Sequence, residues 1–143
     1  MTIKSANHST YDTHYHIVFP VKYRKALLSP GITKAILEIA HQISERYDID
    51  FEVIGTDGDH IHILCTFKPS YSGADVVRIF KSITARQLFK QFPKLREELW
   101  KGELWSDGYY FATVGEKGGI ETIRHYVKNQ GKTMNHSQIS LFN

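Results

Sequence analysis

Cysteine is almost absent from this chain: Cys65 is the only one among 143 residues. A single thiol excludes an internal disulfide framework and a zinc site built from cysteines. Long hydrophobic runs are also missing, since no uninterrupted apolar stretch approaches the ~18–20 residues of a membrane span. The N-terminal residues lack the apolar core of a signal peptide. These absences favour one globular domain in the reducing cytoplasm, with no membrane as a partner.

The charge is close to balanced and says little about the kind of partner. Eighteen Lys and Arg residues face fifteen Asp and Glu residues, which gives a formal net charge of +3 and a pI near 8.9. Such a surplus allows an anionic partner but does not require one. The 41% of apolar residues is enough for a folded core. More distinctive are eight histidines beside eight tyrosines, which supply potential metal ligands and potential nucleophiles.

The spacing of apolar residues predicts four strands and three helices. The strands are expected at 11–19, 49–53, 60–67 and 104–114, the last bent at Asp107-Gly108, and the helices at 30–47, 74–92 and 120–131. Their order, βαββαβα, is that of an α+β ferredoxin-like sandwich, an antiparallel sheet with helices on one face. Residues 1–9 are expected to be frayed, residues 115–119 (GEKGG) to form a flexible joint and residues 132–143 to form a tail.

The first candidate site is His60-Ile61-His62 in the predicted strand 60–67. Residues i and i+2 of a strand point to the same face, so both imidazoles share one side and Ile61 lies on the other. Neutral histidine is the commonest metal-ligating side chain. From the spacing alone, two half-exposed histidines on an open sheet face are the simpler interpretation.

The second candidate site is the pair Tyr126 and Gln130 in the predicted last helix. Four residues apart, they lie on one helix face, one turn from each other. They fall at the edge of the helix's apolar stripe, where the ring of a tyrosine is usually partly buried and its hydroxyl is exposed to solvent. Taken alone, the pair therefore favours a structural role.

A third feature is positive charge beside aromatic rings, the combination that binds unstacked bases and phosphates of single-stranded nucleic acid. The loop Lys22-Tyr23-Arg24-Lys25 and the helix residues Arg78, Lys81, Arg86 and Lys90 carry the charge; Trp100, Trp105, Tyr109 and Tyr110 are the aromatics near the fourth strand. The helix charges fit a solvated face equally well. The loop favours phosphate contact.

One reaction would use all three features. A tyrosine phenol can attack a phosphodiester and release a 3′-hydroxyl, but with a pKa of ~10 it is a weak nucleophile at pH 7. A divalent cation overcomes this by acting as a Lewis acid on the phosphoryl oxygens. Because the bond energy is kept in the phosphotyrosine, a second 3′-hydroxyl can reverse the step without ATP.

These residues, in this order, resemble the small single-tyrosine transposases of single-stranded-DNA insertion sequences, in the HUH endonuclease superfamily. HUH means His-hydrophobic-His, which residues 60–62 match, and the family's Tyr followed four residues later by Gln matches Tyr126 and Gln130. The segments YHIVFPVKYRK, FKSITAR and LWSDGYYFATVG also resemble family segments. The resemblance spans about residues 9–131, so the chain 1–143 is expected to be a single HUH transposase domain.

The resemblance implies that Tyr126 is the nucleophile and that His60, His62 and Gln130 hold Mg²⁺ or Mn²⁺. It also implies a single-stranded DNA partner with a hairpin, and a homodimer in which the tyrosine helix often completes the partner's site. Two other functions stay open: a non-catalytic, domesticated nucleic-acid-binding module of the same fold, and a metal-dependent phosphodiesterase that uses water.

Other polar residues are given lesser roles. Asp59 could orient a ligand imidazole, although turn chemistry is the simpler interpretation. His16 is assigned to packing or hydrogen bonding, His125 to solvent or DNA contact, and Cys65 to the core.

Overall fold

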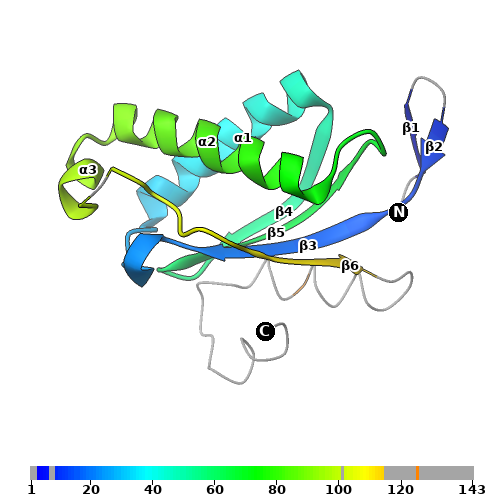
Figure 1. Ribbon diagram of the computed structural model, residues 1–143. Helices are drawn as coiled ribbons and strands as arrows, with labels where there is room; N and C mark the ends of the chain where they lie inside the picture. The colour runs from blue at the N-terminus through cyan, green and yellow to red at the C-terminus, as the bar shows by residue number, and fades with distance from the viewer. Residues whose placement is uncertain (1–2, 7–8, 101, 115–124, 126–143) are drawn as a thin grey trace.

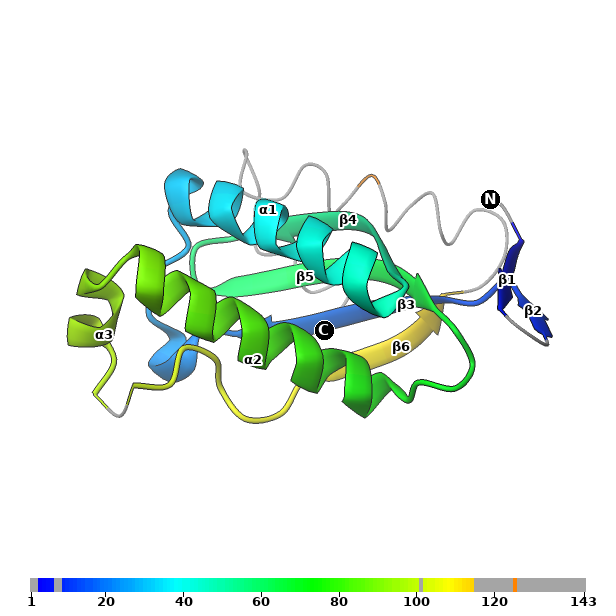
Figure 2. The ribbon, with the colours of Figure 1, turned by 90° about the horizontal axis from the view of Figure 1, so that it is seen from above.

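The structure is a computed structural model that describes residues 3–6, 9–100, 102–114 and 125. Its centre is an antiparallel sheet in the order β4-β5-β3-β6. These strands are β3 (His14–Pro20), β4 (Ile49–Thr56), β5 (His60–Phe67) and β6 (Tyr110–Val114). Figures 1 and 2 show α1 (Pro30–Tyr47) and α2 (Gly73–Gln91) side by side on one face of the sheet. The predicted α+β sandwich is confirmed; the predicted joint, last helix and tail lie outside the described residues.

Both long helices begin at serine caps. The Ser29 side chain accepts a hydrogen bond from the backbone N–H of Ile32, and Pro30 occupies the first turn. At the start of α2, Ser72 and Asp75 form a reciprocal capping box. The helix starts predicted at residues 30 and 74 are therefore correct to within a residue. Within the described residues, no helix is both long enough and apolar enough to cross a membrane.

The strands divide their side chains between two faces. Ile17 and Phe19 of β3, with Ile61 and Ile63 of β5, point toward the helices and join the hydrophobic core. Cys65 belongs to this core and is fully buried, which raises the pKa of its thiol and confirms the predicted packing role. The alternate residues lie on the opposite face of the sheet, and every residue of β5 is buried. The core therefore fixes the direction in which the HxH histidines point.

The N-terminal prediction is wrong. Instead of fraying, β1 (Lys4–Ala6) pairs antiparallel with β2 (Ser9–Tyr11) in a two-stranded sheet separate from the main one. The strand predicted at 11–19 consequently begins at His14. Short polar strands carry no apolar alternation, so the sequence pattern gives no signal for them.

Two other strand boundaries differ from the prediction. The strand predicted at 49–53 continues to Thr56 past a bulge between Phe51 and Val53, which interrupts the period-two pattern. The strand predicted at 104–114 is regular only over β6, and Trp105 before it forms an isolated bridge with Val21. The predicted bend is present: Gly108 has φ +83, a conformation that glycine adopts without strain.

Candidate active site

The HxH histidines lie on β5, between β4 and β3. In the register with β3, His60 is opposite Pro20 and His62 is opposite Val18. Both imidazoles occupy the sheet face away from α1 and α2, as the alternation predicted. The half-exposed interpretation is wrong, because His60 is 7% exposed and His62 is fully buried. Burying two imidazoles is unfavourable unless their nitrogens find partners.

His62 has a partner in His16 on the neighbouring strand β3. His16 Nε2 lies 3.1 Å from His62 Nδ1, with the ring centroids 5.3 Å apart. Burial, with smaller contributions from His16 and His60, lowers the pKa of His62 to about 2. Burial likewise lowers the pKa of His16 to about 4. Both rings are therefore neutral at pH 7, and the hydrogen bond between them has one donor and one acceptor.

His60 is held by the residue just before it. Asp59 Oδ1 lies 2.7 Å from His60 Nδ1, while the other carboxylate oxygen of Asp59 is 3.5 Å from Arg24 Nε. Asp59 also takes part in the turn, donating its backbone N–H to Asp57 O at 2.6 Å. The sequence favoured turn chemistry alone for Asp59; the structure adds the contact that orients an imidazole. A carboxylate partner of this kind raises the basicity of a ligating histidine.

The rings of His60 and His62 share one feature: the Nδ1 atom of each contacts a side chain. Their centroids are 5.0 Å apart, and each Nδ1 faces a neighbouring side chain. In such an arrangement Nε2 is the nitrogen that each ring would present to a cation, and neutral imidazole suits Mn²⁺, Ni²⁺ and Zn²⁺ well. Among the described residues no third His, Cys, Asp or Glu joins these histidines to complete a metal site. Tyr126 and Gln130, the other members of the predicted site, lie outside the described residues.

The basic loop forms η1 (Lys22–Arg24), directly after β3. Tyr23 and Arg24 both have positive φ, 60° and 53°, which is rare for residues other than glycine. The side chain of Arg24 is 68% exposed. Lys22 pairs with Glu103 at 3.0 Å and Lys25 with Glu98 at 3.7 Å. The loop lies beside the HxH motif, since Val21 donates its backbone N–H to Asp59 O.

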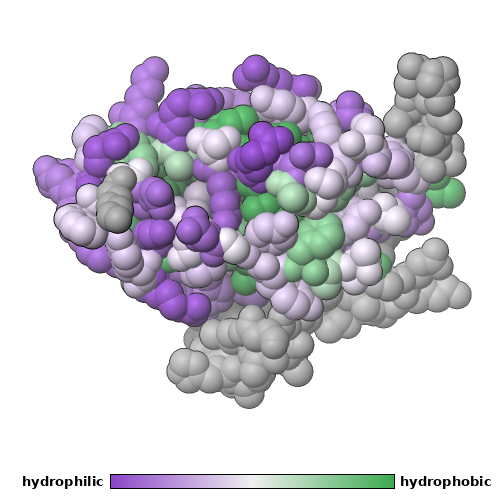
Figure 3. All heavy atoms as spheres, in the orientation of Figure 1, coloured by the Kyte–Doolittle hydropathy of each residue, from purple (hydrophilic) through white to green (hydrophobic). Residues whose placement is uncertain are grey.

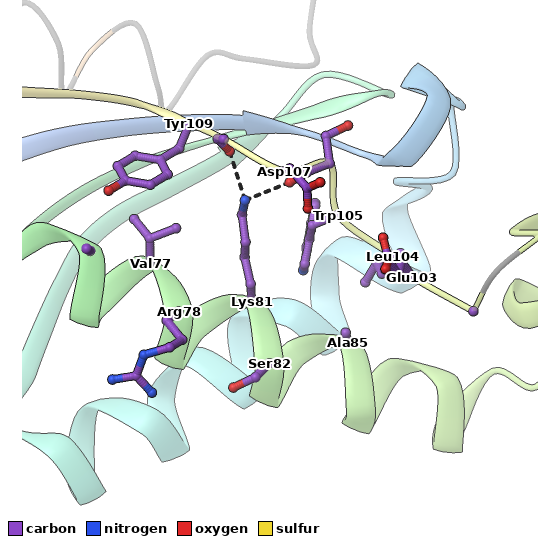
Figure 4. Close-up of a pocket in the computed structure, with 14 residues that line it drawn as sticks. Val77, Arg78, Lys81, Ser82, Ala85, Glu103, Leu104, Trp105, Asp107 and Tyr109 are labelled. Atoms are coloured by element: carbon purple, nitrogen blue, oxygen red, sulfur yellow. Dashed lines mark hydrogen bonds between the residues drawn. The ribbon is translucent and has the colours of Figure 1, made fainter.

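The basic residues of α2 divide into two kinds. Arg86 is exposed, and Arg78 is exposed with its guanidinium 3.4 Å from Asp75. Lys81 instead points across a cavity of about 490 Å³ between α2 and residues 102–109, where Nζ donates to Ser106 O at 2.7 Å and to Gly108 O at 2.8 Å (Figure 4). Burial lowers its pKa. Lys81 thus fastens the bend before β6 to α2, a structural duty that its helical spacing did not reveal.

The aromatic residues near the fourth strand also divide. Trp105 is buried, with Nε1 donating to Thr84 Oγ1 at 2.9 Å. Trp100 is 82% exposed, and Tyr109 and Tyr110 are 43% and 44% exposed. His125 is helical and exposed, as expected for a residue in contact with solvent.

Comparison with known proteins gives consistent matches along most of the chain. The family model described as "Transposase IS200 like" matches residues 9–130. The ISDra2 transposase TnpA of Deinococcus radiodurans is 28% identical over 130 residues, which cover 91% of this chain and 92% of that protein. The transposase for insertion sequence element IS200 of Salmonella typhimurium is 30% identical over 127 residues, covering 89% and 82%.

Solved structures agree with this match. A crystal structure of a Deinococcus radiodurans protein described as a transposase superposes with a TM-score of 0.72 at 28% identity, covering 89% of this chain and 97% of that chain. A REP-associated tyrosine transposase bound to a REP hairpin superposes with a TM-score of 0.61 at 10% identity, covering 87% and 71%. At that identity the second likeness shows the fold alone. On the match of its sequence from residue 9 to 130, this chain belongs to the family of IS200-like transposases.

Proposed function

We propose that this transposase cleaves and rejoins single-stranded DNA at hairpin-marked ends through a covalent 5′-phosphotyrosine on Tyr126. The observation that carries the proposal is the pair of buried imidazoles on β5, each with its Nδ1 beside a neighbouring side chain. A DNA-binding module that does no chemistry has no use for two desolvated imidazoles aligned on one strand. Membership of a transposase family supplies the substrate class.

His60 and His62 would hold a divalent metal, Mg²⁺ or Mn²⁺, with Gln130 as the third ligand by resemblance to the family. The residues fit such an ion, because both imidazoles lie on one face of β5 and the Nδ1 atom of each has a neighbouring side chain that orients the ring. When bound, the ion would polarise the phosphoryl oxygens of the scissile phosphate as a Lewis acid. Since imidazole suits Mn²⁺ better than Mg²⁺, we expect Mn²⁺ to support cleavage at least as well as Mg²⁺.

Tyr126 would act as the nucleophile that attacks the phosphorus of the scissile phosphate. Its phenolic oxygen forms a bond to the phosphorus, the bond from phosphorus to the 3′ oxygen breaks, and the 3′ oxygen leaves as a hydroxyl with the proton lost by the phenol. The ester bond is exchanged rather than hydrolysed. A 3′-hydroxyl of another strand can therefore reverse the step and join the two ends.

The DNA partner is proposed to carry a hairpin beside the cleaved position. A structural neighbour of this chain is a tyrosine transposase bound to a REP hairpin, and the resemblance implies the same kind of partner here. Lys22, Arg24 and Lys25 on the loop, with Arg78 and Arg86 on α2, are the proposed phosphate contacts. The resemblance also implies a homodimer in which the helix bearing Tyr126 can complete the partner's site.

A labelling experiment tests the proposal. The protein is incubated with end-labelled single-stranded DNA that carries the element's hairpin, with Mn²⁺ or Mg²⁺, and the products are separated on a denaturing gel. We expect a labelled band that migrates with the protein, absent in Tyr126→Phe and retained in Tyr47→Phe, a matched tyrosine at the end of α1. Cleavage that survives Tyr126→Phe would indicate hydrolysis by water. Binding without cleavage in either metal would indicate the non-catalytic module.

A second variant tests the metal ligands. His62→Ala is expected to abolish cleavage while hairpin binding, measured by gel shift, stays close to wild type. A melting curve of the variant checks that the sheet is intact. Loss of both binding and cleavage in a folded protein would mean that His62 supports the DNA-binding surface instead.

A further inference from the structure

Two exposed aromatic side chains, Tyr23 and Trp100, lie at the end of the molecule that carries η1. Tyr23 is 51% exposed and Trp100, which follows α3 (Lys94–Glu98), is 82% exposed. Large aromatic rings usually bury most of their surface, because each contributes much apolar area to a core. Figures 1 and 2 show η1 and α3 at the same end of the sheet.

The backbone holds Tyr23 outward at an energetic cost. Tyr23 and Arg24 have consecutive left-handed conformations, which side chains with a Cβ adopt only when their surroundings impose them. Here Lys22 donates its backbone N–H to Leu104 O at 2.8 Å, and Arg24 donates to Val21 O at 2.8 Å. Strain that is kept at an exposed loop points to a function for the side chain it presents.

Trp100 lies in a segment attached to the same loop on both sides. Glu98 pairs with Lys25, and Glu103 pairs with Lys22. Trp100 is two residues from Glu98, so its backbone lies close to the position that pairs with Lys25. The other tryptophan, Trp105, is 5% exposed. The two indoles of this chain therefore have opposite environments.

The surface around these rings carries two exposed cations, Arg24 beside Asp59 and Lys25 beside Glu98. The Arg24 side chain is 68% exposed and that of Lys25 is 43% exposed. Figure 3 shows hydrophilic residues at this end of the molecule as well as over the helices. Charged groups beside exposed rings match the two parts of a nucleotide, its phosphate and its base.

This surface is continuous with the candidate active site. One carboxylate oxygen of Asp59 is 2.7 Å from His60 Nδ1, and the other is 3.5 Å from Arg24 Nε. A strand with its scissile phosphate at His60 would reach Arg24 within the next few nucleotides.

We propose that Tyr23 and Trp100 form a stacking platform for unpaired bases next to the cleaved position, with the phosphates on Arg24 and Lys25. This inference rests on the proposed function, because it assigns the unpaired part of the proposed DNA substrate to the surface around Tyr23 and Trp100. Stacking accepts any base, so the platform would bind unpaired DNA without reading its sequence. Sequence choice would then come from elsewhere on the protein.

Tryptophan fluorescence tests the platform directly. The full chain is titrated with oligo(dT) of twelve nucleotides, an unpaired probe without a hairpin, and the emission is followed. We expect quenching in the wild-type protein that is lost in Trp100→Phe, whose remaining indole is the buried Trp105. A blunt hairpin without a single-stranded extension is expected to leave the emission unchanged. Quenching that persists in Trp100→Phe would overturn the proposal.

Affinity gives an independent measurement. Tyr23→Leu and Trp100→Leu are each expected to weaken oligo(dT) binding by roughly tenfold, measured by fluorescence anisotropy of a labelled oligonucleotide. Tyr23→Phe, which keeps the ring, and Tyr47→Leu, a control far from η1, should bind like wild type. Equal binding by all four variants would overturn the platform. So would emission changes that depend on protein concentration without DNA, because they would assign the surface to a second copy of the chain.

The outcome is separable from that of the proposed function. If the wild-type protein forms the covalent adduct while the Tyr23 and Trp100 variants bind oligo(dT) normally, only the platform fails. If the platform binds DNA but no Tyr126 adduct forms, only the covalent mechanism fails.

Discussion

Lowering the pH from 7 to 5 is expected to destabilise this protein, because burial depresses the pKa of His16 to about 4 and that of His62 to about 2. In the unfolded chain both imidazoles have a pKa near 6.5. As the pH falls below 6.5, the unfolded state binds protons that the folded state does not. Stability is therefore complete above pH 6.5 and declines on acidification, until the folded rings also become protonated.

The size of the effect follows from the same pKa values. Between pH 7 and pH 5 an unfolded imidazole goes from about a quarter protonated to almost fully protonated, while folded His16 stays mostly neutral. Integrating that difference gives a loss of about 2 kcal/mol for His16 and a similar loss for His62. A loss of that size is a large part of the 5–15 kcal/mol that stabilises an ordinary domain.

Urea unfolding of the metal-free protein at pH 7 and pH 5 measures this loss. Other ionisable side chains also contribute to the pH dependence of stability, so a variant must isolate the contribution of His16. In His16→Gln, which keeps a polar partner for His62, the difference between the two pH values should shrink by about 2 kcal/mol.

Two comparisons make this prediction refutable. His41 is exposed on α1, so His41→Gln serves as the control that removes one imidazole and leaves the buried pair intact. His62→Gln should reduce it as His16→Gln does, which covers the case in which one variant folds poorly. If both variants keep the full pH dependence of the wild type, these imidazoles are not buried and neutral in the folded protein.

Three further predictions concern single contacts. Asp59→Ala should weaken Mn²⁺ binding by about 10–100-fold in calorimetry, because His60 loses the carboxylate that orients it; unchanged affinity would assign Asp59 to the turn alone. Gly73→Ala should lower the free energy of unfolding by about 1–3 kcal/mol, since a Cβ there would lie 2.5 Å from the ring of Phe111; a variant as stable as wild type would mean that this ring moves aside freely. Ser72→Ala should cost about 1 kcal/mol through loss of the α2 cap, and Ser72→Asn should restore most of it in the same urea assay.

Regular amphipathic patterns were predicted well from the sequence. The apolar stripe of α1, its Ser29 cap and Pro30 in the first turn are local signals, and the helix forms where they place it. The alternation in β3 and β5 also correctly separated the core side of the sheet from the histidine side. Such patterns are reliable because the period of a helix or strand is set by backbone geometry.

The contacts between distant residues were not predictable in the same way. His16 and His62 lie 46 residues apart, and only the register of β3 against β5 brings their rings within 3.1 Å. Lys81 has the spacing of a solvated helix residue, yet its ammonium donates hydrogen bonds to the carbonyls of Ser106 and Gly108 in the loop before β6. Trp100 and Trp105 are five residues apart in similar sequence surroundings, and only packing distinguishes the exposed indole from the buried one.

By itself, the sequence determined the transposase family, the α+β sandwich and the shared face of His60 and His62, because each depends on residue order and local backbone periodicity. Only the tertiary structure decided that these imidazoles are buried, that His16 and Asp59 hold their Nδ1 atoms, and that the loop of Tyr23 is strained beside the segment of Trp100. These properties depend on strand register and on loop packing. Both arise when segments distant in the chain are brought together, and neither leaves a periodic trace in the sequence.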